Sequence, residues 1–337
     1  MKIVFFIYVF FLAQSYGAPS DAGSDNFEFL RLGHNARPMA MGGAYTAASG
    51  HDGLYWNPAS ISGVSGNVFM LSYRNYVLDT ESGFPALIFD LGKKGRAAFG
   101  LNYFNGGDFY YTDQFGVSNG NFNYIDIAPF VSYARTIFSY FDAGANFKII
   151  RSSVNGDNLD MNSTAFSVDF GGIYRPAMFK RVVFGMVLKD AGFVKSGFTG
   201  SGDGQTLPTT LKFGLKYSPV NIRKLSVNLD LHAPFRGYYE YRGGLEYQID
   251  RNFSVMGGYR LAHQQVKEVF SFFTADNISE EETAPEQFYT WSMGCGMNFG
   301  RFLADVAVFN TDFQICYELS VSRYFNSQKN SDDSPDK

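Results

Sequence analysis

Residues 224–234 read KLSVNLDLHAP, and they alternate between apolar and polar side chains. Leucine or valine stands at positions 225, 227, 229 and 231, with Ser, Asn, Asp and His between them. Because successive side chains of a β-strand point to opposite faces, this period of two predicts a strand with one apolar and one polar face. Residues 314–325, QICYELSVSRYF, show the same alternation.

The alternation recurs along the chain and predicts an all-β fold, a fourteen-stranded antiparallel transmembrane β-barrel. We place the strands at residues 67–78, 83–91, 96–105, 122–136, 141–151, 162–175, 181–190, 207–217, 224–233, 238–249, 252–263, 287–299, 301–310 and 312–325. Most are close to the ~9–11 residues that a tilted strand needs to cross a bilayer. An even strand number is typical of single-chain bacterial barrels.

The composition favours a surface in contact with lipid. Aromatic residues make up 18% of the 337 residues, and charged residues also make up 18%, against roughly 25% in a typical soluble chain. After residue 17 no run of 18 apolar residues occurs, so a membrane form must be a closed barrel. The net charge is −4 with no basic block, so we expect no nucleic-acid partner.

A soluble β-sandwich also produces alternating strands. Two features favour the barrel: the apolar face is bulky and aromatic on strand after strand, and the polar face carries charges of both signs, which in a barrel would line the lumen and pair across strands. The charged positions are Lys148, Asp169, Lys189, Lys212, Lys216, Asp230, Glu240, Arg242, Glu246, Arg260, Asp305 and Glu318.

The connections between strands predict an orientation. Links after the second strand and every other strand after it are short, as periplasmic turns are. Longer links, rich in Gly, Asn, Asp, Ser or acids, are expected at about 106–121, 152–161, 191–206 and 264–286, where they would be outer loops.

Both chain ends carry signals outside the barrel. Residues 1–17 have a basic Lys2, an apolar run from Ile3 to Leu12 and small residues before Gly17, which predicts a signal peptide and export to a bacterial outer membrane. The last strand ends on Phe325, an ending of the kind that outer-membrane assembly machinery reads. The polar tail 326–337 is expected to be disordered.

Residues 18–66 precede the first strand and cannot belong to a wall that fourteen strands already close. They include residues 36–60, ARPMAMGGAYTAASGHDGLYWNPAS, which are rich in Gly and Ala. A barrel of this size is wide enough to leak, and Gly allows close backbone packing. We therefore expect residues 27–66 to fold back as a hatch inside the barrel, residues 67–325.

Residues 36–60 resemble the N-terminal signature of FadL-type outer-membrane proteins, the long-chain fatty acid transporter family. The PorV-like branch, found with a protein-secretion system, shows a similar pattern. Residues 207–217, 241–260 and 291–309 also resemble this family. The resemblance implies hatch or ligand residues at Met41, Gly42, Gly43, Asn57, Pro58 and Ala59. A structural turn is the alternative for Asn57–Ala59. Three aromatic residues of the loop at 264–286 are candidate ligand contacts, namely Phe270, Phe272 and Phe273.

The resemblance implies uptake of hydrophobic small molecules, such as long-chain fatty acids, through an apolar pocket and a hatch-gated path. Outer-membrane lipid, an apolar ligand and the assembly machinery are the expected partners. The alternative is a PorV-like barrel that serves as a secretion or surface-assembly partner. A transporter would show an apolar pocket between hatch and wall, whereas an interaction protein would have a filled lumen.

Other chemistry is not expected. The four His residues have no metal-ligand spacing, no nucleophile is marked by a nearby base, and no cofactor motif occurs, so we expect neither an enzyme nor a cofactor. Cys295 and Cys316 fall on opposite faces of non-adjacent strands, which predicts two free thiols.

Overall fold

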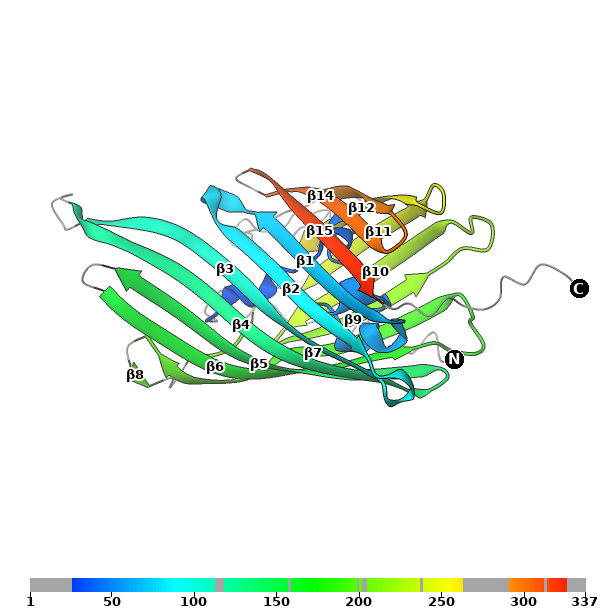
Figure 1. Ribbon diagram of the computed structural model, residues 1–337, viewed down its shortest axis with the longest axis horizontal. Coiled ribbons are helices and arrows are strands. Elements are labelled where there is room, and N and C mark those ends of the chain that lie inside the picture. The colour runs from blue at the N-terminus through cyan, green and yellow to red at the C-terminus, as the bar shows by residue number, and fades with distance from the viewer. Residues whose placement is uncertain are drawn as a thin grey trace, which may run out of the picture.

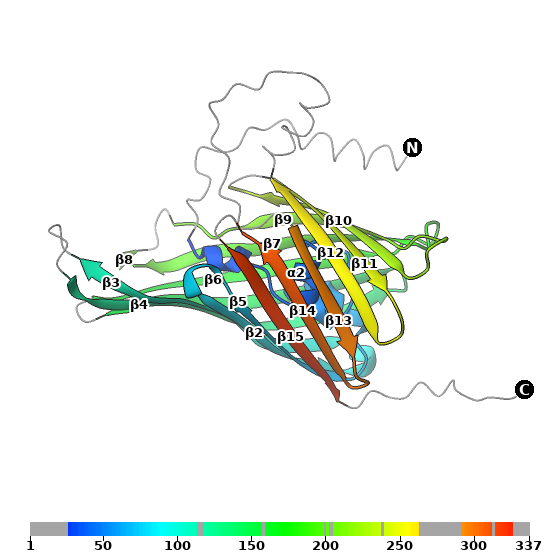
Figure 2. The ribbon, with the colours of Figure 1, turned by 90° about the horizontal axis from the view of Figure 1, so that it is seen from above.

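The computed structural model describes residues 26–112, 118–156, 159–198, 200–201, 205–236, 239–262, 291–311 and 314–325. In this part of the chain fourteen antiparallel strands form a closed ring, which confirms the predicted fold (Figures 1 and 2). The ring consists of β1 (Asn67–Asn75), β2 (Glu81–Asp90), β3 (Arg96–Thr112), β4 (Ser118–Phe138), β5 (Phe141–Gly156), β6 (Leu159–Tyr174), β7 (Val182–Gly197), β9 (Thr210–Tyr217), β10 (Leu225–Pro234), β11 (Glu240–Gln248), β12 (Phe253–Ala262), β13 (Trp291–Asn298), β14 (Phe302–Asn310) and β15 (Ile315–Phe325).

The ring closes where β1 pairs with β15, with Asn67 opposite Phe325. A two-residue strand, β8 (Gly200–Ser201), pairs only with the end of β7. The short helices are η2 (Glu28–Arg31), α2 (Ala36–Ala40), η3 (His51–Gly53), η4 (Pro58–Gly63), η5 (Val77–Asp79) and η6 (Gly92–Lys94). Among the described residues, no helix has the length and apolar character needed to cross a membrane.

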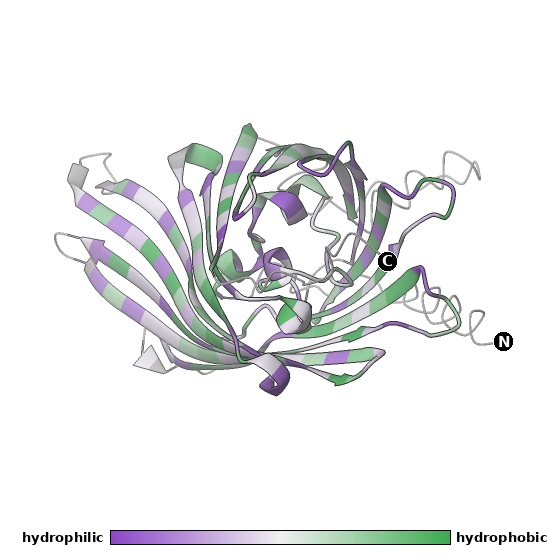
Figure 3. Ribbon diagram, turned by 45° about the vertical axis from the view of Figure 1, so that its right-hand side comes forward, coloured by the Kyte–Doolittle hydropathy of each residue, from purple (hydrophilic) through white to green (hydrophobic). Residues whose placement is uncertain are grey.

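Polar and apolar residues alternate along the strands (Figure 3), and the two faces of the wall are chemically different, as the alternation predicts. On β15 Leu319 is 44% exposed on the outer face, whereas Glu318 is fully buried inside. Glu318 forms an ion pair with Arg74 of β1, with Oε2 and Nη2 2.6 Å apart. Lys148 of β5 likewise contacts Asp169 of β6, at 2.8 Å. The prediction that the charges line the lumen and pair across strands is confirmed for these residues.

The two cysteines are free, as predicted. Cys316 of β15 is buried inside the barrel, and Cys295 lies on β13. Strand β14 lies between them, so the two sulfur atoms have no route to a disulfide.

Three of the predicted outer loops are wrong. Residues 106–121, 152–161 and 191–206 belong largely to strands, because β3 runs to Thr112, β5 to Gly156 and β7 to Gly197. Their Gly, Asn and Ser residues are typical of turns, but a ladder is held by backbone hydrogen bonds and tolerates them. A register shift at Gly107, where φ is 83°, accommodates the irregularity. The loop at 264–286 lies outside the described residues.

Several other strand ends also differ from the prediction, among them those of β1 and β9. β1 ends at Asn75 instead of 78, since the chain turns into η5, and β9 begins at Thr210 instead of 207. Because β3–β6 extend further than predicted, they project beyond the rest of the ring (Figure 1). The wall is therefore higher on one side.

The outer face of β5 changes character along the strand. Phe147 and Ile149 are exposed and apolar, whereas the next outward positions are Arg151, Ser153 and Asn155. On the neighbouring β6, Asn162 accepts hydrogen bonds from Arg151, at 3.0 Å, and from Ser153, at 2.8 Å. Lipid cannot satisfy such polar groups, so on β5 the level between Ile149 and Arg151 marks the outer limit of the membrane-facing band.

This boundary can be tested with two Arg substitutions on one face of β5. Phe147→Arg should destabilise the barrel in lipid vesicles by about 2–4 kcal/mol, because position 147 contacts hydrocarbon. Asn155→Arg, on the same face beyond the boundary, should change the free energy of unfolding by less than about 0.5 kcal/mol. Urea unfolding of the reconstituted variants measures both values. Equal costs would show that the boundary is misplaced.

Candidate functional site

The residues before β1 lie against the inner faces of strands on opposite sides of the barrel (Figures 1 and 3). In this N-terminal segment, residues 26–66, α2 contacts β12–β15 and η4 contacts β4–β6. Directly after α2 the chain turns at Gly42 and Gly43, whose φ angles are 66° and 73°. Only Gly adopts two such consecutive values without strain, which explains the Gly pair.

Trp56 is the centre of packing within the segment, and it is 1% exposed. Gly33 and Gly43 lie against its ring, so a Cβ at either position would come within 2.8 Å of it. The indole Nε1 donates a hydrogen bond to the His34 carbonyl at 2.8 Å. The Lys212 ammonium of β9 lies 5.2 Å from the ring centre. The segment thus has a small aromatic core of its own.

Glycines of the wall allow the segment to touch the strands directly. A Cβ on Gly258 would overlap the Gly42 nitrogen, and one on Gly171 would overlap the Asn57 side chain. The inward glycines that contact the segment are Gly144, Gly171, Gly185, Gly214, Gly244, Gly258, Gly294 and Gly296. The sequence analysis did not predict this set of wall glycines. The signal was present, because Gly on the polar face of a strand indicates the close approach of another backbone.

Polar side chains of the wall also hold the segment. The carboxylate Oδ2 of Asp230 accepts hydrogen bonds from the backbone N–H groups of Tyr45 and Thr46, both at 2.9 Å. The hydroxyl of Ser292 accepts a hydrogen bond from the Gly42 N–H, also at 2.9 Å. Backbone groups that water would otherwise solvate are therefore satisfied inside the lumen.

Arg37 is the main charged anchor. Its Nη2 lies 2.8 Å from Asp305 Oδ1, its Nη1 contacts Glu246, and its Nε lies 3.7 Å from Asp52. Burial opposes the charge, but the carboxylates of Asp305 and Asp52 hold the pKa of Arg37 above its ordinary value. The guanidinium therefore stays charged and ties the segment to β11 and β14.

The structure separates the residues that the resemblance singled out. Met41, Gly42 and Gly43 lie beside β11–β13, whereas Asn57, Pro58 and Ala59 lie beside β5 and β6. Phe270, Phe272 and Phe273 lie outside the described residues.

Asn57 is fully buried and caps η4. Its Nδ2 donates to the Thr46 carbonyl at 2.7 Å, and its Oδ1 accepts from the Ala59 N–H at 3.0 Å. Pro58 follows at the first position of η4. These contacts are those of a structural turn, and they leave no side-chain atom of Asn57 facing open space.

A second, smaller apolar cluster lies on the inner face of β4–β6, apart from the larger one that Met70 and Phe84 of the wall form with Trp56. Ala128 of β4, Ile150 of β5 and Ala165 of β6 face inward and are fully buried. They form one cluster with four residues that do not belong to the ring of strands, namely Phe27, Phe29, Leu30 and Leu207. The sequence contained a signal for this patch. Ile150 is two positions from Lys148 and therefore lies on the same inner face of the strand, yet its side chain is apolar.

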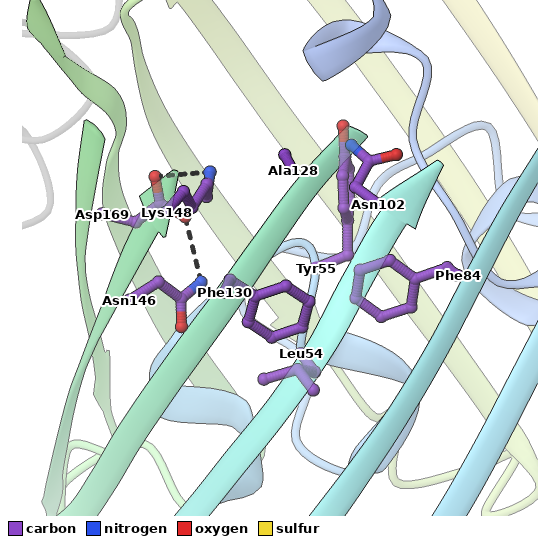
Figure 4. Close-up of a pocket in the computed structure, with 9 residues that line it drawn as sticks. All are labelled: Leu54, Tyr55, Phe84, Asn102, Ala128, Phe130, Asn146, Lys148 and Asp169. Atoms are coloured by element: carbon purple, nitrogen blue, oxygen red, sulfur yellow. Dashed lines mark hydrogen bonds and ion pairs between the residues drawn. The ribbon is translucent and has the colours of Figure 1, made fainter. Parts of the chain in front are cut away.

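A small cavity lies next to this patch (Figure 4). Phe84 and Phe130 stack on one side with ring centres 5.3 Å apart, and Lys148 and Asp169 lie on the other. The space open to the centre of a water-sized sphere is about 10 Å³, which holds about one water molecule. In this conformation the segment fills the space where a transporter would have its pocket.

His34 is a packing group. Its ring stacks on Phe84, with centres 5.2 Å apart, and its Nε2 lies 2.7 Å from the Asn102 Oδ1. Burial and the charge of Arg74 lower the pKa of His34 well below its ordinary value, so the ring is neutral at pH 7. The described residues hold no group of three or more His, Cys, Asp or Glu side chains placed to bind a metal.

Comparison with family models finds no match to this sequence, and comparison with curated proteins finds no significant match. Solved structures do match. The Pseudomonas putida toluene transporter TodX superposes with a TM-score of 0.63 and 15% identity, over 87% of this chain and 98% of TodX. The monoaromatic hydrocarbon channel CymD gives 0.62 and 15%, over 89% and 99%.

A FadL homologue from Pseudomonas aeruginosa superposes with a TM-score of 0.56 and 12% identity, over 86% of this chain and 97% of its own. Identities this low establish the fold alone. That fold agrees with an outer-membrane location. The chain therefore has the fold of FadL-type outer-membrane channels, which is the family that residues 36–60 resemble.

Proposed function

We propose that this protein takes up hydrophobic small molecules, long-chain fatty acids among them, across a bacterial outer membrane. The observation that carries the proposal is the apolar patch formed by Ala128, Ile150 and Ala165 on the inner face of β4–β6, which is separate from the larger apolar cluster around Trp56 and Phe84. The N-terminal segment covers this patch with Phe27, Phe29 and Leu30. Proteins of this fold include a toluene transporter and a monoaromatic hydrocarbon channel.

The apolar patch would stabilise an apolar ligand inside the lumen. Burial of apolar surface contributes about 25 cal/mol per Å². Charged side chains inside the barrel, such as Asp230 and Arg37, offer no such gain. A ligand that displaced Phe27, Phe29 and Leu30 would regain the contacts those side chains make.

The segment is proposed to act as the hatch. Its part from Ala36 onward is held by Arg37, by Asp230 and by the wall glycines, including the contacts of Gly42 and Asn57. We therefore assign Met41–Gly43 and Asn57–Ala59 to seating the hatch rather than to binding ligand. Residues 1–17 as a signal peptide and 67–325 as the barrel complete this proposed division of the chain.

The part of the segment over the patch is held by hydrogen bonds that its movement would have to break. Asn26 Nδ2 donates to Gln205 Oε1 at 2.8 Å, and Arg74 Nη1 donates to the Leu32 carbonyl at 3.0 Å. The Asn26 N–H donates to the Thr206 carbonyl at 2.9 Å, and the Lys189 ammonium donates to the Leu30 carbonyl at 2.9 Å. Movement of residues 26–32 would uncover the patch while the rest of the hatch stays in place. The cavity of about 10 Å³ is too small for a ligand without such movement.

The filled lumen also fits a PorV-like interaction partner, which needs no path for a ligand. One measurement distinguishes the two functions, namely the protein-dependent uptake of labelled oleate or toluene into proteoliposomes. Uptake at the rate of empty vesicles, with no bound lipid extracted from the purified barrel, would favour the interaction partner.

A disulfide between residues 26 and 206 should block uptake. The hydrogen bond from the Asn26 N–H to the Thr206 carbonyl places the two Cα atoms within the range that a disulfide spans. In a Cys295→Ser, Cys316→Ser background, oxidised Asn26→Cys/Thr206→Cys protein should lose at least about tenfold in uptake rate, because the patch stays covered. A reductant should restore the rate.

The single Cys variants are the controls, and oxidation should leave their uptake rates unchanged. If the cross-linked barrel, verified by mass spectrometry, transports as fast as the reduced one, residues 26–32 do not gate uptake.

Gly258→Ala should unseat the hatch and leave the barrel folded. Its Cβ would overlap the Gly42 nitrogen, whereas a Cβ on the adjacent Gly257 meets only the Ser292 oxygen, at 4.0 Å. Gly258→Ala should raise single-channel conductance in planar bilayers severalfold and expose the segment to protease, while Gly257→Ala should behave as wild type. Loss of the folded barrel in Gly258→Ala, judged by heat-modified gel mobility, would show that the segment is part of the folding core.

A further inference from the structure

The outside of the barrel carries a row of tyrosines near the end where the short turns lie. Tyr174 of β6, Tyr217 of β9 and Tyr247 of β11 point outward and are 43%, 40% and 42% exposed. Each stands at the last or the last but one position of its strand. Aromatic girdles of this kind lie where the hydrocarbon of a membrane gives way to the lipid headgroups. The turns beyond these tyrosines therefore lie at headgroup level.

Two neighbouring turns at this level are basic. Residues 175–181, between β6 and β7, read RPAMFKR, and residues 218–224, between β9 and β10, read SPVNIRK. β7 pairs with β9, and the Ser218 N–H donates a hydrogen bond to the Arg181 carbonyl at 3.0 Å, so the two turns lie side by side. Together they contain five cationic residues and no acidic one. This part of the headgroup level is thus strongly positive.

A groove opens where these turns meet the outer face of the wall. Its volume is about 380 Å³, and it is lined by Met178, Phe179, Lys180, Arg181, Val182 and Tyr217. Val182 and Tyr217 lie opposite each other in the ladder between β7 and β9, on the outward face. We call this feature the turn groove. It has an apolar wall on the side of the membrane and two cations on the side of the turn.

The two cations of the turn groove are placed to receive an anion. Among the residues that the structure describes, no carboxylate forms an ion pair with Lys180 or Arg181. Arg181 Nη1 donates to the carbonyls of Ser218 and Pro219, at 3.3 and 3.4 Å. These bonds hold the guanidinium beside the groove. Because a guanidinium has five N–H donors, others remain for a ligand.

The combination of a cationic and an apolar side fits a phospholipid with a net negative charge. Its phosphate would meet Lys180 and Arg181, and an acyl chain would cover the apolar wall. The ammonium of a zwitterionic headgroup would be repelled by the same two cations. A soluble phosphate would gain nothing from the wall, and an acidic protein would have to displace lipid to reach Tyr217.

We propose that the turn groove binds an anionic phospholipid of the periplasmic leaflet, with its phosphate on Lys180 and Arg181 and one acyl chain along Val182 and Tyr217. The short turns are the predicted periplasmic end of the barrel, which places the site in that leaflet. The bound lipid links the two turns, because Arg181 also holds the turn between β9 and β10. The site lies on the outside of the wall, so the inference does not depend on the proposed uptake.

Native mass spectrometry of the full chain tests this proposal. The detergent-purified protein is offered equimolar palmitoyl-oleoyl phosphatidylglycerol and palmitoyl-oleoyl phosphatidylethanolamine. Wild-type protein should retain the anionic lipid at least about fivefold more than the zwitterionic one. Lys180→Gln/Arg181→Gln should lower retention of phosphatidylglycerol about tenfold, because both phosphate contacts are lost. Lys180→Gln alone, which removes no hydrogen bond among the described residues, should lower it about fivefold and is decisive if the double variant fails to fold.

The matched control is Lys93→Gln/Lys94→Gln, which removes the same charge from η6, an exposed turn at the same end of the barrel. It should retain phosphatidylglycerol as wild type does. Equal losses in the two double variants would overturn the site, since they would show only the diffuse charge of the turns. So would equal retention of both lipids by wild type. Displacement of the lipid by millimolar inorganic phosphate would also overturn it, because the groove would then be a site for free anions.

Discussion

The structure depends on the requirement that every backbone N–H and C=O group in lipid be paired. A sheet meets this requirement only when its edges join, which here happens between β1 and β15. Closure fixes which side chains face outward, so Leu319 meets lipid while its neighbour Glu318 must find Arg74 inside. The ion pairs of the lumen are therefore a consequence of closure, because each buried charge needs a partner.

Fourteen strands also enclose more space than their own side chains fill. The N-terminal segment occupies it, and the contact is made at backbone level. Where Gly258 meets Gly42, neither residue has a side chain, so two backbones touch. Such contacts hold the segment together with the apolar cluster that Met39 and Trp56 form with Phe84 of the wall. The apolar patch beside Ile150 is covered by Phe27 and Phe29. One architecture thus combines a part that is seated on the wall glycines with a part that covers the patch.

The strand alternation was sufficient to predict the ring, because a period of two is a local property of the chain. Position 150 shows the limit of that reasoning. The sequence placed Ile150 in a strand, on the same face as Lys148 and Ser152. It could not predict an apolar patch there, because Ala128 and Ala165 come beside Ile150 only when β4, β5 and β6 pair. The loop predictions at 106–121 and 152–161 were wrong for a related reason. Turn-forming residue types describe local preference, whereas the backbone ladder that overrides it forms between distant residues.

The sequence by itself determined the class of fold, the two faces of each strand and the unusual N-terminal stretch, since all three follow from residue types at fixed spacing. Only the tertiary structure decided where that stretch lies, which glycines it touches, and which inward side chains of β4–β6 it covers. These features depend on which residues of different strands share one level of the barrel. That relation is set by register and closure, which no single segment of the chain encodes.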